Sequence, residues 1–127
     1  MKFVLSSLGL IIICTYLSSV AYTQQKKKRD LLAIPEVTRD KVICFALYTV
    51  NEKTLKLTAQ FYPLTKDESR EAKLEILNNG NWKTIAKTKI IERGWTAPFR
   101  VENWDDSKKA SYRVSHGKNA TYECIIQ

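Results

Sequence analysis

The chain has 127 residues, which is room for one domain of ordinary size once any targeting segment is subtracted. Its 21 Lys and Arg residues outnumber its 13 Asp and Glu residues, giving a formal net charge of +8 at pH 7. The single histidine excludes a cluster of histidine ligands for a transition metal, and the four glycines form no phosphate-cradling loop.

Residues 1–21 have the layout of a secretory signal peptide. Lys2 gives a positive start, residues 4–17 are almost wholly apolar, and Ser19 and Ala21 are small residues at the −3 and −1 positions of a cleavage site. A retained membrane anchor is the alternative, but an apolar run of about 14 residues is short of the roughly 20 that span a bilayer. We therefore expect export to the periplasm, the cell surface or the medium, with no stable membrane span after cleavage.

Residues 22–40 are predicted to be a basic linker. Lys26, Lys27, Lys28 and Arg29 form a tract that could bind nucleic acid or an anionic membrane surface. No aromatic residues interleave with the tract and no nucleic-acid-binding motif follows it. A solvated linker is the simpler interpretation, and we expect no nucleic-acid partner.

The domain proper is predicted over residues 41–127, where the pattern is β throughout. Residues 42–50 form an apolar run that indicates a strand buried on both faces. Residues 54–62 alternate between apolar and polar side chains, a period that fits a strand and not a helix. Residues 67–73 are helix-tolerant, but the segment that follows them looks like a strand entering a hairpin.

Turn signals separate the remaining strands. Asn79-Gly80 predicts a tight hairpin turn with positive φ, and residues 82–91 form the return strand. Shorter strands follow over residues 99–104, 111–115 and 121–126. About seven short strands and no convincing helix predict an all-β domain, an immunoglobulin-like or fibronectin-like antiparallel β-sandwich.

Two cysteines remain if Cys14 leaves with the signal peptide. Cys44 and Cys124 are 80 positions apart, in the predicted first and last strands. A disulfide between them would stabilise the fold by roughly 4–5 kcal/mol through the unfolded chain, provided that the Cα atoms come within about 7 Å. The sequence leaves the bridged and the free state open.

The segment 94–106, "GWTAPFRVENWDD", is the densest in chemistry-bearing residues. Trp95 and Trp104 could form an aromatic binding surface for sugar rings. Three carboxylates could instead ligate calcium, and they are Glu102, Asp105 and Asp106. The structural alternative places Trp95 and Phe99 in the core and uses the aspartates in a turn. We favour that alternative.

The sequence offers no catalytic residue, no metal ligand and no cofactor site that we would assign. His116 precedes Gly117 and is expected to be a surface histidine in a turn. Neither a nucleophile-elbow motif nor a convergent acid and base is present. Asn119 begins an N-glycosylation acceptor pattern, Asn-Ala-Thr, which matters only in a eukaryotic host.

Four segments carry a family resemblance: "KVICFALYTV", "TLKLTAQFYPL", "GWTAPFRVENWDD" and "YRVSHGKNATYE". In this order they resemble the N-terminal region of exported bacterial metallophosphoesterases of the alkaline phosphatase D-like kind. The resemblance covers residues 41–127, and its third segment is the most specific. In that family a β-sandwich precedes a calcineurin-like catalytic domain, which holds two divalent metal ions and hydrolyses phosphate mono- or diesters.

The resemblance implies a non-catalytic accessory domain whose catalytic domain is missing. The family pattern has a glycine and a linker where this sequence has Cys124 and ends at Gln127. The expected partner is therefore a metallophosphoesterase catalytic domain, in cis or as a separate chain, and the chain alone is not expected to be an enzyme. The alternative is a free-standing secreted binding module for a glycan or a protein, with Trp95 and Trp104 as its contacts.

Overall fold

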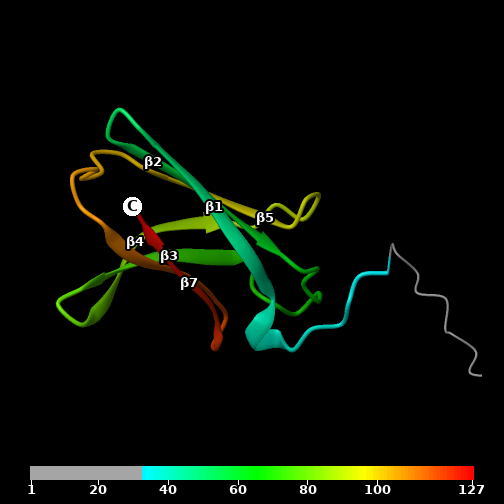
Figure 1. The fold of residues 1–127 in the computed structure, drawn as a ribbon. Helices are drawn as coiled ribbons and strands as arrows, with labels where there is room; N and C mark the ends of the chain where they lie inside the picture. Colours follow the sequence, from blue (N-terminus) through cyan, green and yellow to red (C-terminus); the bar gives the residue numbers. More distant parts are fainter. Residues whose placement is uncertain (1–32) are drawn as a thin grey trace, which may run out of the picture. The chain divides into compact units, whose positions relative to one another are not determined.

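The computed structural model describes residues 33–127, so the predicted signal peptide and most of the predicted linker lie outside the described residues. The described part is nearly all β (Figure 1). No helix in it is long and apolar enough to cross a membrane. A short 3₁₀ helix, η1 (Arg39–Lys41), precedes seven strands: β1 (Ile43–Asn51), β2 (Thr54–Phe61), β3 (Glu71–Asn78), β4 (Asn81–Lys89), β5 (Thr96–Val101), β6 (Ala110–His116) and β7 (Ala120–Ile126).

The strands form two antiparallel sheets, which face each other as a sandwich (Figure 1). The three-stranded sheet has the order β1-β2-β5, and the four-stranded sheet has the order β4-β3-β6-β7. The fourth strand pairs with the third, whereas in a constant-type immunoglobulin domain the fourth strand pairs with the fifth in the other sheet. The predicted seven-stranded β-sandwich is confirmed, with a strand order unlike that of a constant-type domain.

The core lies between the sheets and is built from alternate residues of each strand. Leu55, Leu57 and Ala59 of β2 are buried, as the alternation in the sequence predicts. Tyr112 of β6 faces them from the other sheet and packs edge-on against Tyr48, with 6.3 Å between ring centroids. Burial raises the pKa of Tyr112 well above its ordinary value.

Strand β1 differs from its prediction, because only one of its faces is buried. It is an edge strand, in which Phe45 is 44% exposed and Leu47 is 69% exposed. The register shifts between Ile43 and Phe45, so Cys44 occupies a β-bulge. The prediction of burial on both faces was wrong, because an apolar run cannot show whether a second layer covers its outer side.

Strand β5 begins and ends earlier than predicted. It runs from Thr96 to Val101, and Trp104 lies beyond it in the connection to β6. Pro98 stands within the strand, opposite Thr58 of β2. A proline is tolerated there because β5 is an edge strand, where the missing backbone N–H need not pair with a further strand.

Both hairpin turns that close with two residues have positive φ. Asn79 (φ 48°) and Gly80 (φ 77°) join β3 to β4, which confirms the predicted turn. Glu52 (φ 47°) and Lys53 (φ 58°) join β1 to β2 in the same way without glycine or asparagine. The β1–β2 turn therefore has a strained backbone, and its sequence lacks the residues that usually indicate positive φ.

We predict that removing this strain stabilises the fold. Glu52→Asn combined with Lys53→Gly should raise the free energy of unfolding by about 1 kcal/mol or more, because left-handed backbone is costly for residues with ordinary side chains. Urea denaturation measures the change. Lys66→Gly, in the β2–β3 connection and outside the positive-φ region, is the control and should not stabilise. A double variant no more stable than wild type would contradict strain in the turn.

The two faces of the three-stranded sheet should also differ sharply in their sensitivity to truncation. Leu57→Ala, at a site 1% exposed, should lower the free energy of unfolding by about 2–5 kcal/mol through a core cavity. Leu47→Ala, on the adjacent strand but 69% exposed, should change it by less than about 0.5 kcal/mol. Denaturation followed by tryptophan fluorescence compares them. Equal losses would contradict the assignment of inner and outer faces.

Candidate functional site

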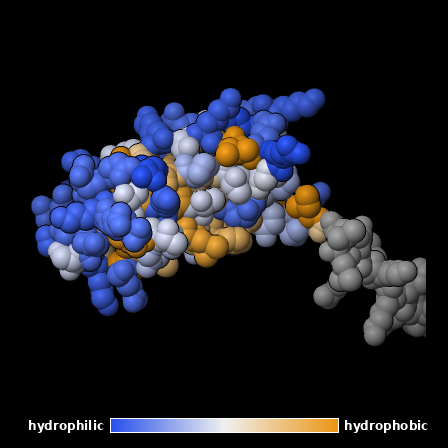
Figure 2. All heavy atoms as spheres, turned by 90° about the horizontal axis from the view of Figure 1, so that it is seen from above, coloured by the Kyte–Doolittle hydropathy of each residue, from blue (hydrophilic) through white to orange (hydrophobic). Residues whose placement is uncertain are grey.

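Three connections gather at one end of the sandwich, at the left in Figure 1. They are the β1–β2 turn, the β3–β4 turn and the β5–β6 loop (residues 102–109). Hydrophilic residues crowd this end in Figure 2. This end also holds four of the five described non-glycine residues with positive φ, Glu52, Lys53, Asn79 and Asn103. Asparagine tolerates this conformation, so the strain lies at Glu52 and Lys53.

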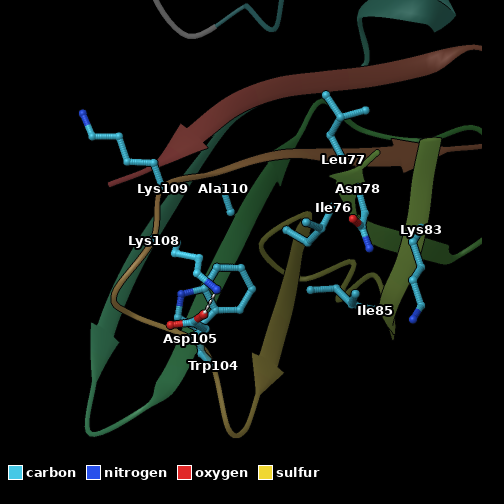
Figure 3. Close-up of a pocket in the computed structure, with 10 residues that line it drawn as sticks. All are labelled: Ile76, Leu77, Asn78, Lys83, Ile85, Trp104, Asp105, Lys108, Lys109 and Ala110. Atoms are coloured by element: carbon cyan, nitrogen blue, oxygen red, sulfur yellow. Dashed lines mark ion pairs between the residues drawn. The ribbon is translucent and has the colours of Figure 1, made fainter. Parts of the chain in front are cut away.

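A pocket of 430 Å³ opens at this end between the β3–β4 hairpin and the β5–β6 loop (Figure 3). Its volume falls within the range of about 300–1,000 Å³ that is usual for small-ligand sites. Half of the pocket lining is apolar and half is polar or charged. The apolar residues are Ile76, Leu77, Ile85, Trp104 and Ala110, and the polar or charged residues are Asn78, Lys83, Asp105, Lys108 and Lys109. We call it the Trp104 pocket.

The apolar part of the Trp104 pocket is made by residues that also touch the core. Ile76 and Ile85 point toward the indole ring of Trp104 in Figure 3, and all three side chains are partly buried against the core. The indole Nε1 is buried and has no hydrogen-bond partner among the described residues. A buried donor without a partner costs about 1–3 kcal/mol, so an acceptor that reached this N–H would relieve the cost.

The charged part of the pocket is mostly positive. Asp105 is held in place, because its carboxylate accepts hydrogen bonds from the Ser107 hydroxyl at 2.5 Å and the Ser107 backbone N–H at 3.2 Å. It also pairs with Lys108, with 2.9 Å between Nζ and Oδ2. No salt bridge within residues 33–127 involves Lys83 or Lys109. Three lysines thus line the pocket against one carboxylate.

Trp95 and Trp104 do not share one surface. They stand before and after β5, whose six residues span about 20 Å. Trp95 is fixed by its surroundings: the Arg70 guanidinium lies over its ring, 5.4 Å from the centroid, and its carbonyl accepts from the Phe61 N–H at 2.8 Å. Trp95 therefore has a structural role at the opposite end of the domain, and Trp104 alone lines the candidate site.

The three carboxylates proposed as calcium ligands are not gathered around one point. Glu102 accepts from the Thr54 hydroxyl at 2.8 Å and from Arg100 at 2.5 Å, while Asp105 is held by Ser107 and Lys108. Residues 33–127 contain no group of three or more His, Cys, Asp or Glu side chains that could hold a metal ion. The carboxylates of this segment act in turns and ion pairs.

The only histidine differs from its prediction. His116 is the last residue of β6 and is only 5% exposed. Its Nε2 lies 2.7 Å from the Ser69 carbonyl oxygen, and its ring meets Phe61 edge-on with 5.6 Å between centroids. The prediction of a surface turn histidine was wrong, because β6 extends to residue 116 and its alternation turns Tyr112, Val114 and His116 inward.

Cys44 and Cys124, for which the sequence left the bridged and the free state open, are both free in the structure. Cys44 occupies the bulge of β1 and is half-buried, while Cys124 is exposed on β7. Burial raises the pKa of the Cys44 thiol, which makes it a weaker nucleophile at neutral pH. Asn119, the acceptor of the glycosylation pattern, is exposed in the β6–β7 turn.

A second surface that stands out is the outer face of the three-stranded sheet. Its side chains lie in rows across β1, β2 and β5, according to the register of the strands. The rows are Phe45–Gln60–Thr96, Leu47–Thr58–Pro98 and Thr49–Lys56–Arg100. Two adjacent rows therefore carry no charge, on a protein with a formal charge of +8.

The edge of β1 is also unguarded in comparison with the other edge strands. Natural sheets protect their edges with lysines, other charges, prolines or bulges. Each of the other three edges has such residues: Lys83, Lys87 and Lys89 in β4, Pro98 and Arg100 in β5, and Glu123 in β7. The nine residues of β1 include no proline and no charge, and its bulge protects only its beginning.

On the outer face of the four-stranded sheet, a charged side chain of the same sheet covers an aromatic ring. The guanidinium of Arg113 lies over the ring of Trp82, 4.6 Å from the centroid, and donates to Glu75 at 2.7 Å. The cation–π contact and the ion pair cover the aromatic ring with the domain's own charge. The three-stranded sheet has no such cover over Phe45 and Leu47, and Leu47 is more exposed than Leu77 (41%) or Ile125 (48%) of the four-stranded sheet.

The Asp105 interactions predict a pH dependence of stability. The hydrogen bond from Ser107 and the contact with Lys108 lower the pKa of Asp105 from 3.8 to about 2. A lowered folded pKa means that the stabilisation is complete above about pH 4 and is lost as the pH falls through about 2. Asp105→Asn should therefore differ from wild type in stability at neutral pH, and the difference should shrink toward pH 2.

Urea unfolding between pH 2 and pH 7 measures this difference. The matched control is Asp106→Asn, because the hydrogen bonds and the ion pair of this turn go to Asp105. A stability difference between wild type and Asp105→Asn that stays constant down to pH 2 would contradict the assigned role of the carboxylate.

No protein-family model, curated protein or solved structure matches the chain. The resemblance to alkaline phosphatase D-like metallophosphoesterases therefore stays a prediction based on the four quoted segments. The two-sheet fold is established independently of that resemblance.

Proposed function

We propose that the chain is a non-catalytic accessory module that docks on a partner domain through the outer face of its three-stranded sheet. The observation that carries this proposal is the exposure of Phe45 and Leu47 side by side on an edge strand without charges. Contiguous apolar side chains at a sheet surface favour association, because covering them removes apolar area from water. The free backbone groups of β1 add hydrogen bonds for a strand laid alongside.

The family resemblance supports a metallophosphoesterase catalytic domain as the partner, in cis or as a separate chain. In this arrangement the two divalent metal ions and their ligands belong to the partner. The sandwich contributes a rigid surface beside the partner's substrate path, in the exported location that the predicted signal peptide implies. The uncharged rows around Leu47 and Phe45 form the contact, and the row with Lys56 and Arg100 forms its polar rim.

We predict that the purified chain alone does not hydrolyse phosphate esters. Bis-p-nitrophenyl phosphate and p-nitrophenyl phosphate, each with manganese, zinc or calcium, are the test substrates. Robust turnover that depends on the metal and co-purifies with the chain would overturn the non-catalytic part of the proposal.

Docking is tested with the catalytic domain of an alkaline phosphatase D-like enzyme from the same genome, expressed separately. Leu47→Lys should weaken binding in calorimetry by about tenfold or more, since a charge then enters the centre of the contact. Ile125→Lys is the matched control: this aliphatic side chain is 48% exposed on β7 of the four-stranded sheet, and its replacement should leave the affinity unchanged. Equal binding by wild type and Leu47→Lys would contradict this surface, and no binding to any such domain would contradict the function.

A further inference from the structure

We infer that the Trp104 pocket is a binding site for a sugar ring that carries an anionic group. This inference concerns the loop end of the sandwich and not the outer face of the three-stranded sheet. It therefore stands or falls separately from the proposed docking function.

The apolar part of the pocket fits the face of a sugar ring. The indole of Trp104 and the side chains of Ile76 and Ile85 face one another across the pocket (Figure 3). A pyranose presents C–H groups on its faces, which pack against an aromatic ring, and hydroxyls around its edge. Asn78 lines the same pocket and supplies an amide that can donate to and accept from those hydroxyls.

The polar part of the pocket disfavours a wholly apolar ligand. Such a ligand would cover the Asn78 amide and the lysine ammonium groups without hydrogen-bonding to them. The free-energy cost of removing these groups from water exceeds the gain from the apolar contact. A ligand with acceptors around an apolar ring satisfies both kinds of surface.

Because lysines outnumber carboxylates in the lining of the pocket, we expect the ligand to be negatively charged. Lys83 and Lys109 lie at opposite edges of the pocket in Figure 3, with the Lys109 side chain extended away from the indole, and no carboxylate within the described chain pairs with either. Lys108 is paired with Asp105 beside the indole ring. A carboxylate or phosphate on the sugar would form charge-assisted hydrogen bonds with these lysines, which are roughly twice as strong as neutral ones.

The test follows the indole N–H signals of the whole chain by ¹⁵N NMR. The described residues contain three tryptophans, and Trp82→Phe and Trp95→Phe identify the Trp104 signal by elimination. The anionic probes are a disaccharide of glucuronic acid and N-acetylglucosamine, and glucose 6-phosphate. A neutral disaccharide of N-acetylglucosamine and inorganic phosphate are the comparison probes. We expect the anionic sugars to shift the Trp104 signal saturably and to leave Trp82 and Trp95 in place.

Substitution of the lysines tests the charge. Lys83→Met combined with Lys109→Met should weaken binding of the anionic disaccharide about tenfold or more, because hydrogen bonds to charged groups are lost. Binding should also weaken as salt is raised. Lys118→Met is the matched control, since Lys118 is exposed in the β6–β7 turn at the other end of the sandwich, and it should not change the affinity.

Four outcomes overturn the inference. An unchanged Trp104 signal with every probe shows that the pocket does not bind sugars. A shift with inorganic phosphate as strong as with the anionic sugars shows an anion site without a sugar contact. Equal affinity for the neutral disaccharide, or unchanged affinity in the double lysine variant, shows that the charge has no role. None of these readouts depends on a Trp104 variant, so the test does not require the fold to tolerate a change there.

Discussion

The structure depends on one constraint: alternate side chains of each sheet must be buried against the other sheet. Leu57 of β2 in the three-stranded sheet is almost completely buried, and so are Leu74 of β3 and Val114 of β6 in the four-stranded sheet. Because a strand alternates its side chains, fixing one set in the core fixes the other set on the outside. The exposure of Phe45 and Leu47 follows directly, since Ala46 and Tyr48 of the same strand face inward.

The number of strands and the all-β class could be predicted because both rest on local signals. The alternation in β2 and the Asn79-Gly80 turn are properties of short segments, and the structure has both. What the sequence could not predict depends on neighbours in space. An apolar β1 fits a covered or an uncovered outer face equally well, and Pro98 looks like a strand boundary unless β5 is known to be an edge. The burial of His116 likewise depends on how far β6 extends.

The candidate site also combines a residue that the sequence indicates with residues that only contacts in space bring together. Trp104 was singled out from the sequence because it lies in a dense segment, but its expected companion, Trp95, stands at the other end of β5. Its companions in space are Ile76 on β3 and Ile85 on β4, more than fifteen residues away in the chain. An aliphatic residue in an amphipathic strand gives no sign that it will face a particular loop. The pocket is a property of the packed sandwich and has no sequence signature of its own.

The two surfaces proposed for binding are held by different parts of the domain and meet at the β1–β2 turn. The backbone N–H of Trp104 donates to the Lys53 carbonyl at 2.7 Å, which ties the β5–β6 loop to the β1–β2 turn. Lys53 and Glu52 hold left-handed backbone, so the carbonyl keeps its direction only while the β1–β2 pairing keeps the turn closed. A partner strand beside β1 would reinforce this pairing, and the loop would hold Trp104 in its place over Ile76. The β1–β2 turn thus connects the loop that carries Trp104 to the strand that carries the docking face.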